Sequence, residues 1–470
     1  MTQASFDLVV IGGGPAGYVG AIRAAQLGMR VALVERADLG GTCLNWGCIP
    51  TKALLHAAEL LRACRGAARF GVHVGEPRVD LAEMVAHSRQ VAGRLNAGVR
   101  TLLRRHRVAV HPGTARLQGA GRVEVAEAAG GRRLLPARHV LVATGARARR
   151  WPGLEAADPD RIWSYREALA PKAVPASLLV VGAGAIGMEF ASFYAALGTR
   201  VTVVEAQARV LPAEDDEVSA FVQAAFEREG IRVLTGCAVE ALDAGPGGVR
   251  ARLRVAGRAE NLDAERALVA IGVAGNVEGL GLETTSAQVE RGFIVADAAG
   301  ATAQAGLHAA GDVAGPPWLA HKASHQAVAC VERIAGGGPG EGLAGATAPA
   351  IPACTFCHPQ VASVGLPERA ARAQGRPVRV GRFPFSANGR AIAAGLDEGF
   401  VKTVFDAETG ELLGAHLVGS GVTELVQGFA IAGALEATEA ELAGMVFPHP
   451  TLSEAMHESV LAALGRALHA

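Results

Sequence analysis

Two cysteines lie close together near the N-terminus, in the stretch GGTCLNWGCIPTK that spans residues 40–52. Cys43 and Cys48 are five positions apart, and Pro50 suits the first turn of the helix that the apolar spacing of the next residues predicts. Cys48 is therefore expected at a helix N-terminus, where the dipole favours a thiolate and lowers the pKa of a thiol. Gly47 would let the backbone bring Cys43 back toward Cys48.

Such a pair can be two buried thiols, part of a metal site, or a disulfide that reacts. A zinc site needs two more ligands at a suitable spacing, and the only other close pair is Cys354 and Cys357, with His358 beside it. Seven cysteines in 470 residues are an odd number and do not form the framework of a secreted protein. We expect no metal site, assign no role to Cys354 and Cys357, and favour a redox-active disulfide.

A histidine near the C-terminus is the best candidate for a base. Exchange between a dithiol and a disulfide needs a proton acceptor, because the thiolate is the attacking species. His449 precedes Pro450, which favours an extended backbone, and Glu454 follows five residues later. The same stretch also fits a helix capping box, in which Thr451 and Glu454 only satisfy backbone donors. The pattern alone leaves both interpretations open.

One pattern, which predicts the elements that position these groups, occurs twice, in residues 9–35 and again in residues 179–205. Each copy reads as an apolar strand, a glycine turn, a helix closed by glycine, and a valine-rich strand that ends in an acid. This is a βαβ unit with a G-x-G-x-x-G fingerprint, which places a pyrophosphate on the helix N-terminus and a ribose beside the acid. The fingerprint residues are Gly12, Gly14, Gly17 and Glu35 in the first copy, and Gly182, Gly184, Gly187 and Glu205 in the second.

The remaining pattern predicts how the chain is divided. Strand ends at residues 140–145 and 267–272 would each close one nucleotide domain, and residues 335–346 are glycine-rich and resemble a linker. Short strands are expected between residues 350 and 430, with helices from about 435. We predict an α/β protein with two Rossmann-like dinucleotide-binding domains, one inserted in the other, and a C-terminal α+β domain. The predicted limits are 1–147, 148–275, 276–345 (a segment that completes the first domain) and 346–470.

Composition excludes several classes of protein. The chain has 45 basic and 45 acidic residues, and this balance argues against a nucleic-acid binder. No apolar run is long enough to cross a bilayer. The N-terminal residues lead directly into a strand pattern rather than a signal peptide, so we expect a cytoplasmic protein with no membrane insertion.

The segment GGTCLNWGCIPTKALL resembles the active-site disulfide of the pyridine nucleotide–disulfide oxidoreductases, a family of flavoproteins, and the similarity extends over essentially the whole chain. The resemblance implies that the first βαβ unit holds FAD, that the second holds NAD, and that Cys43 and Cys48 form the redox disulfide. NAD is expected rather than NADP because Glu205 would repel a 2′-phosphate. Four further stretches, residues 316–327, 351–368, 381–391 and 447–460, resemble the members that oxidise protein-bound dihydrolipoamide.

The resemblance also implies roles for residues that the pattern alone leaves ordinary. Lys52 and Glu189, which otherwise read as common helix residues, would pair beside the flavin, and Asp312 would bind the ribityl chain. His449 and Glu454 would form a catalytic dyad. The other implied contacts are Thr144, Gly145 and Ala320 to FAD, and Gly272 to NAD. The chain departs from the family at Val273 and Gly275, where an arginine and a proline are frequent.

The implied partners are a second copy of the chain and a lipoyl-bearing protein. The C-terminal domain would form a homodimer in which the histidine completes the active site of the other subunit. The lipoyl group would belong to a 2-oxo acid dehydrogenase complex or to the glycine cleavage system. A non-catalytic flavin-binding subunit would be expected to lack Cys43, Cys48 or His449, and all three are present.

Overall fold

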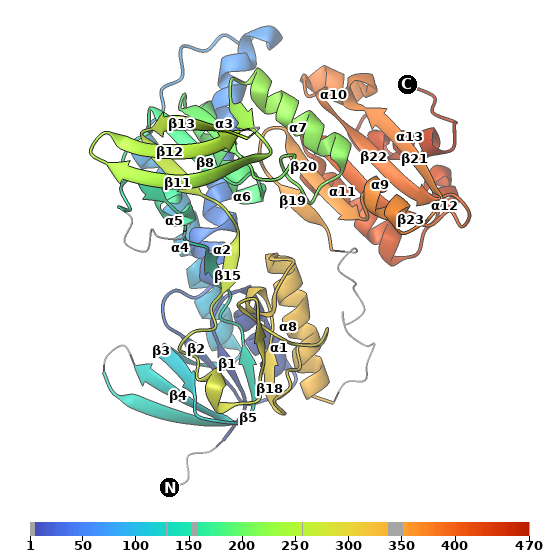
Figure 1. Cartoon of the computed structure of the whole chain (residues 1–470). Coiled ribbons are helices and arrows are strands. Elements are labelled where there is room, and N and C mark those ends of the chain that lie inside the picture. Colours follow the sequence, from blue (N-terminus) through green and yellow to red (C-terminus); the bar gives the residue numbers. More distant parts are fainter. Residues whose placement is uncertain (1–4, 128–129, 152–157, 256, 337–350, 470) are drawn as a thin grey trace. The chain divides into compact units, whose positions relative to one another are not determined.

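The computed structural model describes residues 5–127, 130–151, 158–255, 257–336 and 351–469, and Figure 1 shows the whole chain. The predicted linker at residues 335–346 lies almost entirely outside the described residues. The chain forms two compact units, each described below by itself. The first comprises Met1–Leu54, Ala82–Arg149 and Gly272–Ala346, and the second comprises Leu55–Leu81, Arg150–Ile271 and Thr347–Ala470. The four domain limits drawn from the sequence stay a prediction.

A parallel sheet forms the centre of the first unit. β1 (Phe6–Ile11) lies between β2 (Val31–Glu35) and β5 (Arg132–Val142), β18 (Leu307–Ala309) pairs with β5, and β3 (Ala109–Leu117) pairs with β2. The first predicted βαβ unit is therefore confirmed. The other elements are α1 (Pro15–Gln26), which lies beside α8 (Ala320–Ile334) in Figure 1, with α2 (Gly41–Trp46), the start of α3 (Cys48–Gly66, whose residues from Leu55 belong to the second unit), α4 (Leu81–Arg105), β4 (Arg122–Glu127), β6 (Ala146–Ala148), β15 (Val273–Gly275), β16 (Val289–Glu290) and β17 (Phe293–Ile294).

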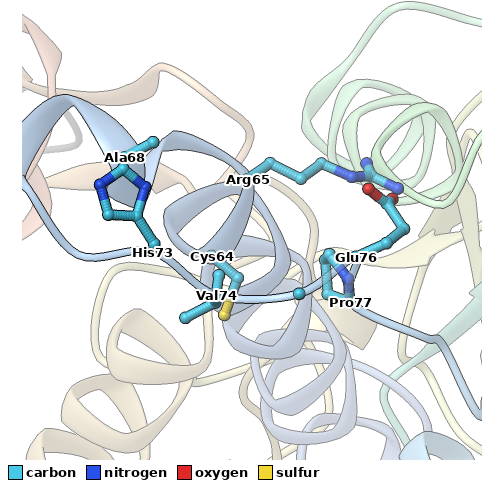
Figure 2. A pocket seen from close by; sticks show the side chains of 8 residues that line it. Cys64, Arg65, Ala68, His73, Val74, Glu76 and Pro77 are labelled. Carbon is cyan, nitrogen blue, oxygen red and sulfur yellow. The ribbon is translucent and has the colours of Figure 1, made fainter.

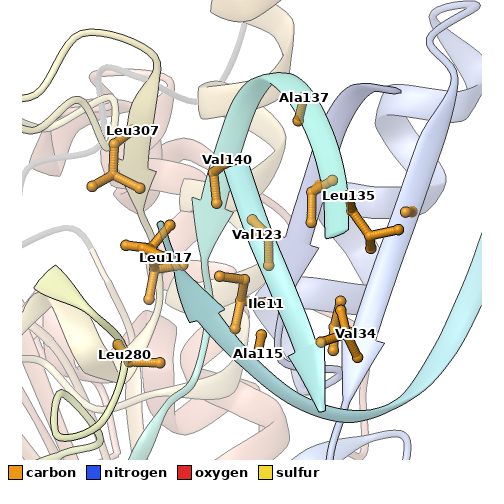
Figure 3. Close-up of a cluster of buried hydrophobic side chains, with 14 of the residues drawn as sticks. Ile11, Val34, Ala115, Leu117, Val123, Leu135, Ala137, Val140, Leu280 and Leu307 are labelled. Carbon is orange, nitrogen blue, oxygen red and sulfur yellow. The ribbon is translucent and has the colours of Figure 1, made fainter. Parts of the chain in front are cut away.

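The strands of this sheet are apolar on both faces because both faces are covered. Val9 and Ile11 belong to one buried cluster, whereas Leu8 and Val10 point to the opposite face, where α1 packs. Figure 3 shows the first cluster, in which Ile11 lies among side chains from β3, β4 and β5. The two cores hold the carboxyl end of β1, and with it the first glycine turn, in a fixed position.

The second unit contains another parallel sheet, in the order β10-β9-β8-β14-β7. β8 (Ser177–Val181), α6 (Ala185–Ala196) and β9 (Arg200–Val204) form the second predicted βαβ unit, which is confirmed. An antiparallel sheet of β11, β12 and β13 adjoins it. The remaining elements are α5 (Tyr165–Leu169), α7 (Asp216–Arg228), β7 (Ile162–Trp163), β10 (Arg232–Leu234), β11 (Cys237–Gly245), β12 (Gly248–Val255), β13 (Arg258–Ala264) and β14 (Arg266–Val269).

The C-terminal part of this unit is an antiparallel sheet in the order β19-β20-β23-β22-β21, covered by helices. Helical structure begins earlier than the sequence predicted, since α9 (Glu368–Ala373) and α10 (Gly389–Ala394) lie among the strands and α11 runs over Val422–Ala434 after β23. Its apolar residues, such as Val426 and Phe429, pack on the sheet, and this burial stabilises the helix. The elements are β19 (Ala353–Thr355), β20 (Gln360–Gly365), β21 (Val378–Pro384), β22 (Gly399–Asp406), β23 (Leu412–Gly419), α9 (Glu368–Ala373), α10 (Gly389–Ala394), α11, α12 (Glu439–Gly444) and α13 (Glu454–Ala463).

A charged network with a buried lysine at its centre lies within the second unit. The Lys402 side chain on β22 is only 2% exposed, and its Nζ lies 3.0 Å from Asp215, 2.6 Å from Glu217 and 2.8 Å from Glu368. Asp215 is the N-cap of α7 and accepts the backbone N–H of Glu217. The network therefore ties the start of α7 to the C-terminal sheet, since losing one partner of a buried ion pair is costly.

Candidate active site

The first glycine turn, between β1 and α1, leaves room for a ligand at one glycine only. Gly12 has a φ of +104°, and a Cβ there would lie 2.4 Å from the carbonyl oxygen of Ala143; a Cβ on Gly17 would lie 1.8 Å from the oxygen of Gly12. At Gly14 the nearest atom to such a Cβ would be the Cα of Gly41, 3.8 Å away. Gly14 also precedes α1 without a side-chain cap. The turn thus fits a pyrophosphate at a helix N-terminus.

The second turn repeats this arrangement. A Cβ on Gly182 would lie 2.5 Å from the oxygen of Ala270, and one on Gly187 would lie 2.0 Å from the oxygen of Gly182. No atom would lie within 4 Å of a Cβ on Gly184, which is the uncapped N-cap of α6. The residues at both turns therefore suit a dinucleotide, one in each unit.

The acids at the ends of β2 and β9 brace these turns. The Oε2 of Glu35 accepts the backbone N–H of Gly13 at 2.6 Å, and its Oε1 accepts the N–H two residues after the glutamate at 2.7 Å. Glu205 makes the matching bonds, from Ala183 at 2.7 Å and from the N–H two residues onward at 2.8 Å. The sequence did not predict this bracing. Each carboxylate oxygen can accept a second bond, so acceptance from a ribose hydroxyl stays a prediction.

Thr144 and Gly145 follow β5 and are bound to a residue that the sequence did not single out. Asn276 donates its side-chain amide to the backbone carbonyl of Thr144 at 2.8 Å and its backbone N–H to the carbonyl of Gly145 at 2.9 Å. The backbone carbonyl of Asn276 in turn accepts the hydroxyl of Thr144 at 2.8 Å. Gly272, with a φ of +105°, accepts the N–H of Arg149 at 3.0 Å. The cofactor contacts of Thr144, Gly145 and Gly272 stay predictions.

The departure from the family in β15 has a steric explanation. A Cβ on Gly275 would lie 2.5 Å from the carbonyl oxygen of Gly292, so the neighbouring chain leaves no room for a side chain. The carbonyl of Val273 accepts the Nε of Arg149 at 2.8 Å. β15 also pairs with β6, so these residues hold two crossing segments together.

The two cysteines lie on consecutive helices. Cys43 is in α2, Gly47 ends that helix, and Cys48 is the first residue of α3, which confirms the predicted place of Cys48. The carbonyl of Gly47 accepts both the N–H and the hydroxyl of Thr51, at 3.0 and 2.7 Å. A hydrogen bond joins the side chains of Cys43 and Cys48, and no disulfide links these two residues in this structure.

Charges of both signs surround the thiol pair. The hydrogen bond to Cys48, together with burial, raises the pKa of Cys43 far above its ordinary value. Lys52, one turn into α3, acts in the opposite direction, and Asp312 adds to the increase. Burial also raises the pKa of Asp312, and Lys322 opposes that shift. Cys43, Cys48, Lys52 and Asp312 are therefore brought together within the first unit.

Asp312 and Ala320, which are both predicted to contact FAD, each lie at the start of a helical element of the first unit. Asp312 opens a 3-10 turn, and the N–H of the preceding Gly311 donates to Gln326 at 2.9 Å. Ala320 is the first residue of α8, whose N-cap makes no side-chain bond. Both roles toward FAD stay predictions.

Two asparagines fix the segment before Cys48. The side chain of Asn45 is buried and donates to the carbonyls of Leu39 and Gly41, each at 2.9 Å. Asn96, on α4, donates to the same Leu39 carbonyl at 2.7 Å. Neither residue was predicted from the sequence. The asparagine between two candidate redox cysteines was the available signal, whereas nothing in the pattern linked Asn96 to them.

The predicted base and its acid lie together in the second unit. His449 Nδ1 is 2.9 Å from Glu454 Oε1, and Glu454 Oε2 accepts the N–H of Thr451 at 2.9 Å. Burial opposes ionisation of Glu454, but the Thr451 N–H and the imidazole outweigh it and hold the pKa of this carboxyl below its ordinary value. The histidine side chain is largely exposed, so a substrate can reach its other nitrogen.

Glu189 is buried in α6, one turn from the helix start. Its Oε1 accepts the backbone N–H of Phe356 at 2.9 Å. The nearby His358 N–H donates to Ser192, also on α6, at 3.0 Å. Glu189 belongs to the second unit and Lys52 to the first, so their pairing stays a prediction.

A surface cavity of about 410 Å³ lies at the end of α3 (Figure 2). Cys64, Arg65, His73 and Glu76 are among the residues that line it, and no predicted site residue does. Arg65 donates to the carbonyl of Ala196 at 2.8 Å. We assign this cavity no part in the chemistry.

Two kinds of feature are absent from the part of the chain that the structure describes. No cluster of three or more histidine, cysteine or acidic side chains there could hold a metal ion. No described helix is long and apolar enough to span a membrane.

The chain belongs to the pyridine nucleotide-disulphide oxidoreductases. Residues 6–327 match the sequence model of that family, and residues 351–460 match the model of its dimerisation domain. The α/β architecture is that of the family, and the dimerisation domain supports a homodimer. Proteins of this family use FAD and a pyridine nucleotide. The two glycine turns, one for each dinucleotide, are consistent with this.

Particular relatives share nearly the whole chain. The dihydrolipoyl dehydrogenase of Zymomonas mobilis subsp. mobilis is 53% identical over 467 residues, which cover 99% of each chain. The enzyme of the same name from Rhizobium etli is 48% identical over 482 residues, with 99% of each chain covered. Among solved structures, LpdA from Mycobacterium tuberculosis has a TM-score of 0.89 at 29% identity and covers 96% of this chain and 98% of its own.

Proposed function

We propose that this protein is a dihydrolipoyl dehydrogenase. It oxidises a protein-bound dihydrolipoyl group to lipoyl and reduces NAD to NADH, with FAD between the dithiol and the nicotinamide. The single observation that carries this proposal is the neighbouring pair Cys43 and Cys48 in a chain that is about half identical, over its full length, to proteins of that name.

The residues can be given roles in disulfide exchange. His449 takes the proton of one substrate thiol, and Glu454 orients the imidazole and stabilises its charged form. The substrate thiolate attacks the Cys43 sulfur of the Cys43–Cys48 disulfide, so a mixed disulfide forms and Cys48 leaves as a thiolate. The second substrate thiol then attacks the substrate sulfur of the mixed disulfide. This step closes the lipoyl ring and releases Cys43.

The balance of this exchange is one disulfide for another. The substrate dithiol loses two electrons and two protons, and the Cys43–Cys48 pair gains the two electrons. When bound, FAD and NAD supply the two-electron chemistry that returns the cysteines to the disulfide. Lys52 and Glu189 would form the ion pair beside the flavin, and the two glycine turns would hold the pyrophosphates.

The partners follow from the same proposal. The dehydrogenase would act as a homodimer in the cytoplasm, with His449 of each subunit serving the cysteines of the other. Its substrate would be the lipoyl domain of a 2-oxo acid dehydrogenase complex or of the glycine cleavage system. We expect neither a nucleic-acid partner nor insertion into a membrane.

A steady-state assay tests the proposal. The purified protein with FAD should reduce NAD when free dihydrolipoamide is added, at a rate far above that with reduced glutathione. Turnover of glutathione with NADP, but not of dihydrolipoamide with NAD, would instead indicate another member of the family.

A further inference from the structure

Residues 44–47 connect the two cysteines, and this segment is called the bridge below. One side chain from a helix distant in the sequence contacts the bridge. Arg89, on α4, donates from Nη1 to the carbonyl oxygen of Asn45 at 2.6 Å. Its guanidinium carbon also lies 4.7 Å from the centroid of the Trp46 ring, which is a cation–π distance. Arg89 therefore contacts two of the four residues that set how far apart the sulfurs can lie.

Two of the three guanidinium nitrogens of Arg89 are held away from water at a cost. The Nε and Nη2 atoms of Arg89 are buried and have no hydrogen-bond partner among the described residues. Burial lowers the pKa of Arg89, but a guanidinium remains charged at neutral pH. A partly buried cation with unpaired, buried donors is unfavourable unless nearby negative charge compensates it.

Reduction of the disulfide creates negative charge close to this bridge. The open pair carries a thiolate when Cys48 is released, whereas the closed disulfide is neutral. Of the charged groups that act on Cys43, Lys52 favours its thiolate and Asp312 disfavours it. A cation anchored on the bridge would favour the reduced pair over the disulfide.

We propose that Arg89 is a positioning residue of the redox pair, which fixes the bridge between Cys43 and Cys48 and stabilises its reduced form. The inference rests on the proposed function of these cysteines as the reactive disulfide. It adds to that function a residue that acts through its contacts with Asn45 and Trp46.

The test measures the thiol–disulfide equilibrium of the holoenzyme directly. Wild type, R89M, R89K and the control R94M, which alters an exposed arginine of the same helix, are equilibrated without oxygen in defined mixtures of reduced and oxidised dithiothreitol. Each dithiothreitol that closes to its cyclic disulfide gives two electrons and two protons to one Cys43–Cys48 disulfide. Alkylation and mass spectrometry then give the reduced fraction of the pair.

We expect R89M to lower the ratio of reduced to oxidised pair about tenfold in the same buffer, which corresponds to about 30 mV for a two-electron couple. R89K keeps the charge but loses the planar stacking on Trp46. Its ratio of reduced to oxidised pair should therefore be about threefold above that of R89M and about threefold below that of wild type. R94M should match wild type. The FAD content and the thermal midpoint of the oxidised forms should stay unchanged, because the effect lies in the reduced state.

An unchanged ratio in R89M would overturn the proposal, as would loss of FAD with no change in the ratio, which would make Arg89 a cofactor ligand. If R89M does not fold, R89K decides alone, and a ratio equal to wild type would contradict the inference. The measurement uses neither dihydrolipoamide nor NAD. Failure of the proposed function would therefore appear in the turnover assay and not here.

Discussion

His449 Nδ1 lies 2.9 Å from Glu454 Oε1, and the other oxygen of the same carboxylate accepts the backbone N–H of Thr451 at 2.9 Å. One side chain thus holds the imidazole and satisfies a donor just before α13. The two interpretations that the sequence left open, a catalytic dyad and a helix-start contact, are compatible in the structure. The helix-start contact is only part of a capping box, because the side chain of the N-cap Ser453 accepts no backbone N–H of α13.

Replacing this carboxylate with an amide separates its two roles. In E454Q the amide oxygen can still accept the Thr451 N–H, but the negative charge beside the imidazole is lost. We expect kcat with dihydrolipoamide to fall on the order of 10²-fold, since general-base catalysis contributes at least that much. The control E424Q, at an exposed position of α11, should keep the wild-type rate. Equal rates for E454Q and wild type in the NADH assay would contradict a role for the dyad.

Hybrid dimers test whether the subunits share their active sites. The variants C43S and H449Q should each be inactive alone. A dimer of one C43S and one H449Q subunit would contain one site with both groups intact if the histidine serves the other subunit. Mixing the two variants under conditions of subunit exchange should therefore restore about a quarter of the wild-type activity, because half of the dimers are hybrids and half of their sites are intact.

No recovery in that mixture, with exchange verified by differently tagged subunits, would show that the histidine acts within its own chain. Mixing C43S with C48S is the matched control. Both changes affect the same disulfide, so no arrangement of subunits can restore a site, and the mixture should stay inactive.

Glu205 is expected to select the nucleotide. Removing its charge in E205Q would abolish the repulsion of a 2′-phosphate, and the amide can keep only part of the bracing of Ala183. We expect the ratio of kcat/KM with NAD to kcat/KM with NADP to fall about tenfold or more. A tenfold change corresponds to the loss of about 1.4 kcal/mol of the free-energy difference by which the enzyme discriminates between the two nucleotides. E240Q, on β11, should leave the ratio unchanged. A ratio unaffected by E205Q would assign the preference to other residues.

Glu214 makes stability depend on pH. This side chain is only 7% exposed, and burial raises its pKa to about 7, helped by Asp215 and opposed by a bond to Ser363. A carboxyl whose pKa is raised on folding stabilises the protein below its unfolded pKa of about 4.3, and this contribution is lost as the pH rises through about 7. E214Q stays neutral, so it should be more stable than wild type at pH 8.

Thermal unfolding of the FAD-loaded protein measures this difference. We expect a midpoint for E214Q that is about 2 °C or more above wild type at pH 8, for a gain of about 1 kcal/mol, and equal midpoints at pH 4. The exposed variant E240Q should follow wild type at both values. A larger gain at pH 4 than at pH 8 would reverse the sign and contradict the assignment.

Sequence patterns predicted those parts of the molecule whose structure depends on residues close together in the sequence. Both βαβ units and the place of Cys48 at a helix start follow from glycine spacing and apolar periodicity, and the structure has them. The bracing of the turns by Glu35 and Glu205 was not predicted, because an acid after a strand reads only as a ribose acceptor. Contacts such as Arg89 to Asn45 and Lys402 to Asp215 join residues far apart in the sequence, and no local period encodes them.

The proposed function depends on electrons passing through the Cys43–Cys48 pair. The most direct measurement is NADH formation from dihydrolipoamide by FAD-loaded wild type and C43S, with NADH oxidation by an artificial acceptor measured on the same samples. We predict one NADH per dihydrolipoamide for wild type and none for C43S, while C43S keeps its FAD and still oxidises NADH. Equal lipoamide production by C43S and wild type would contradict the central claim.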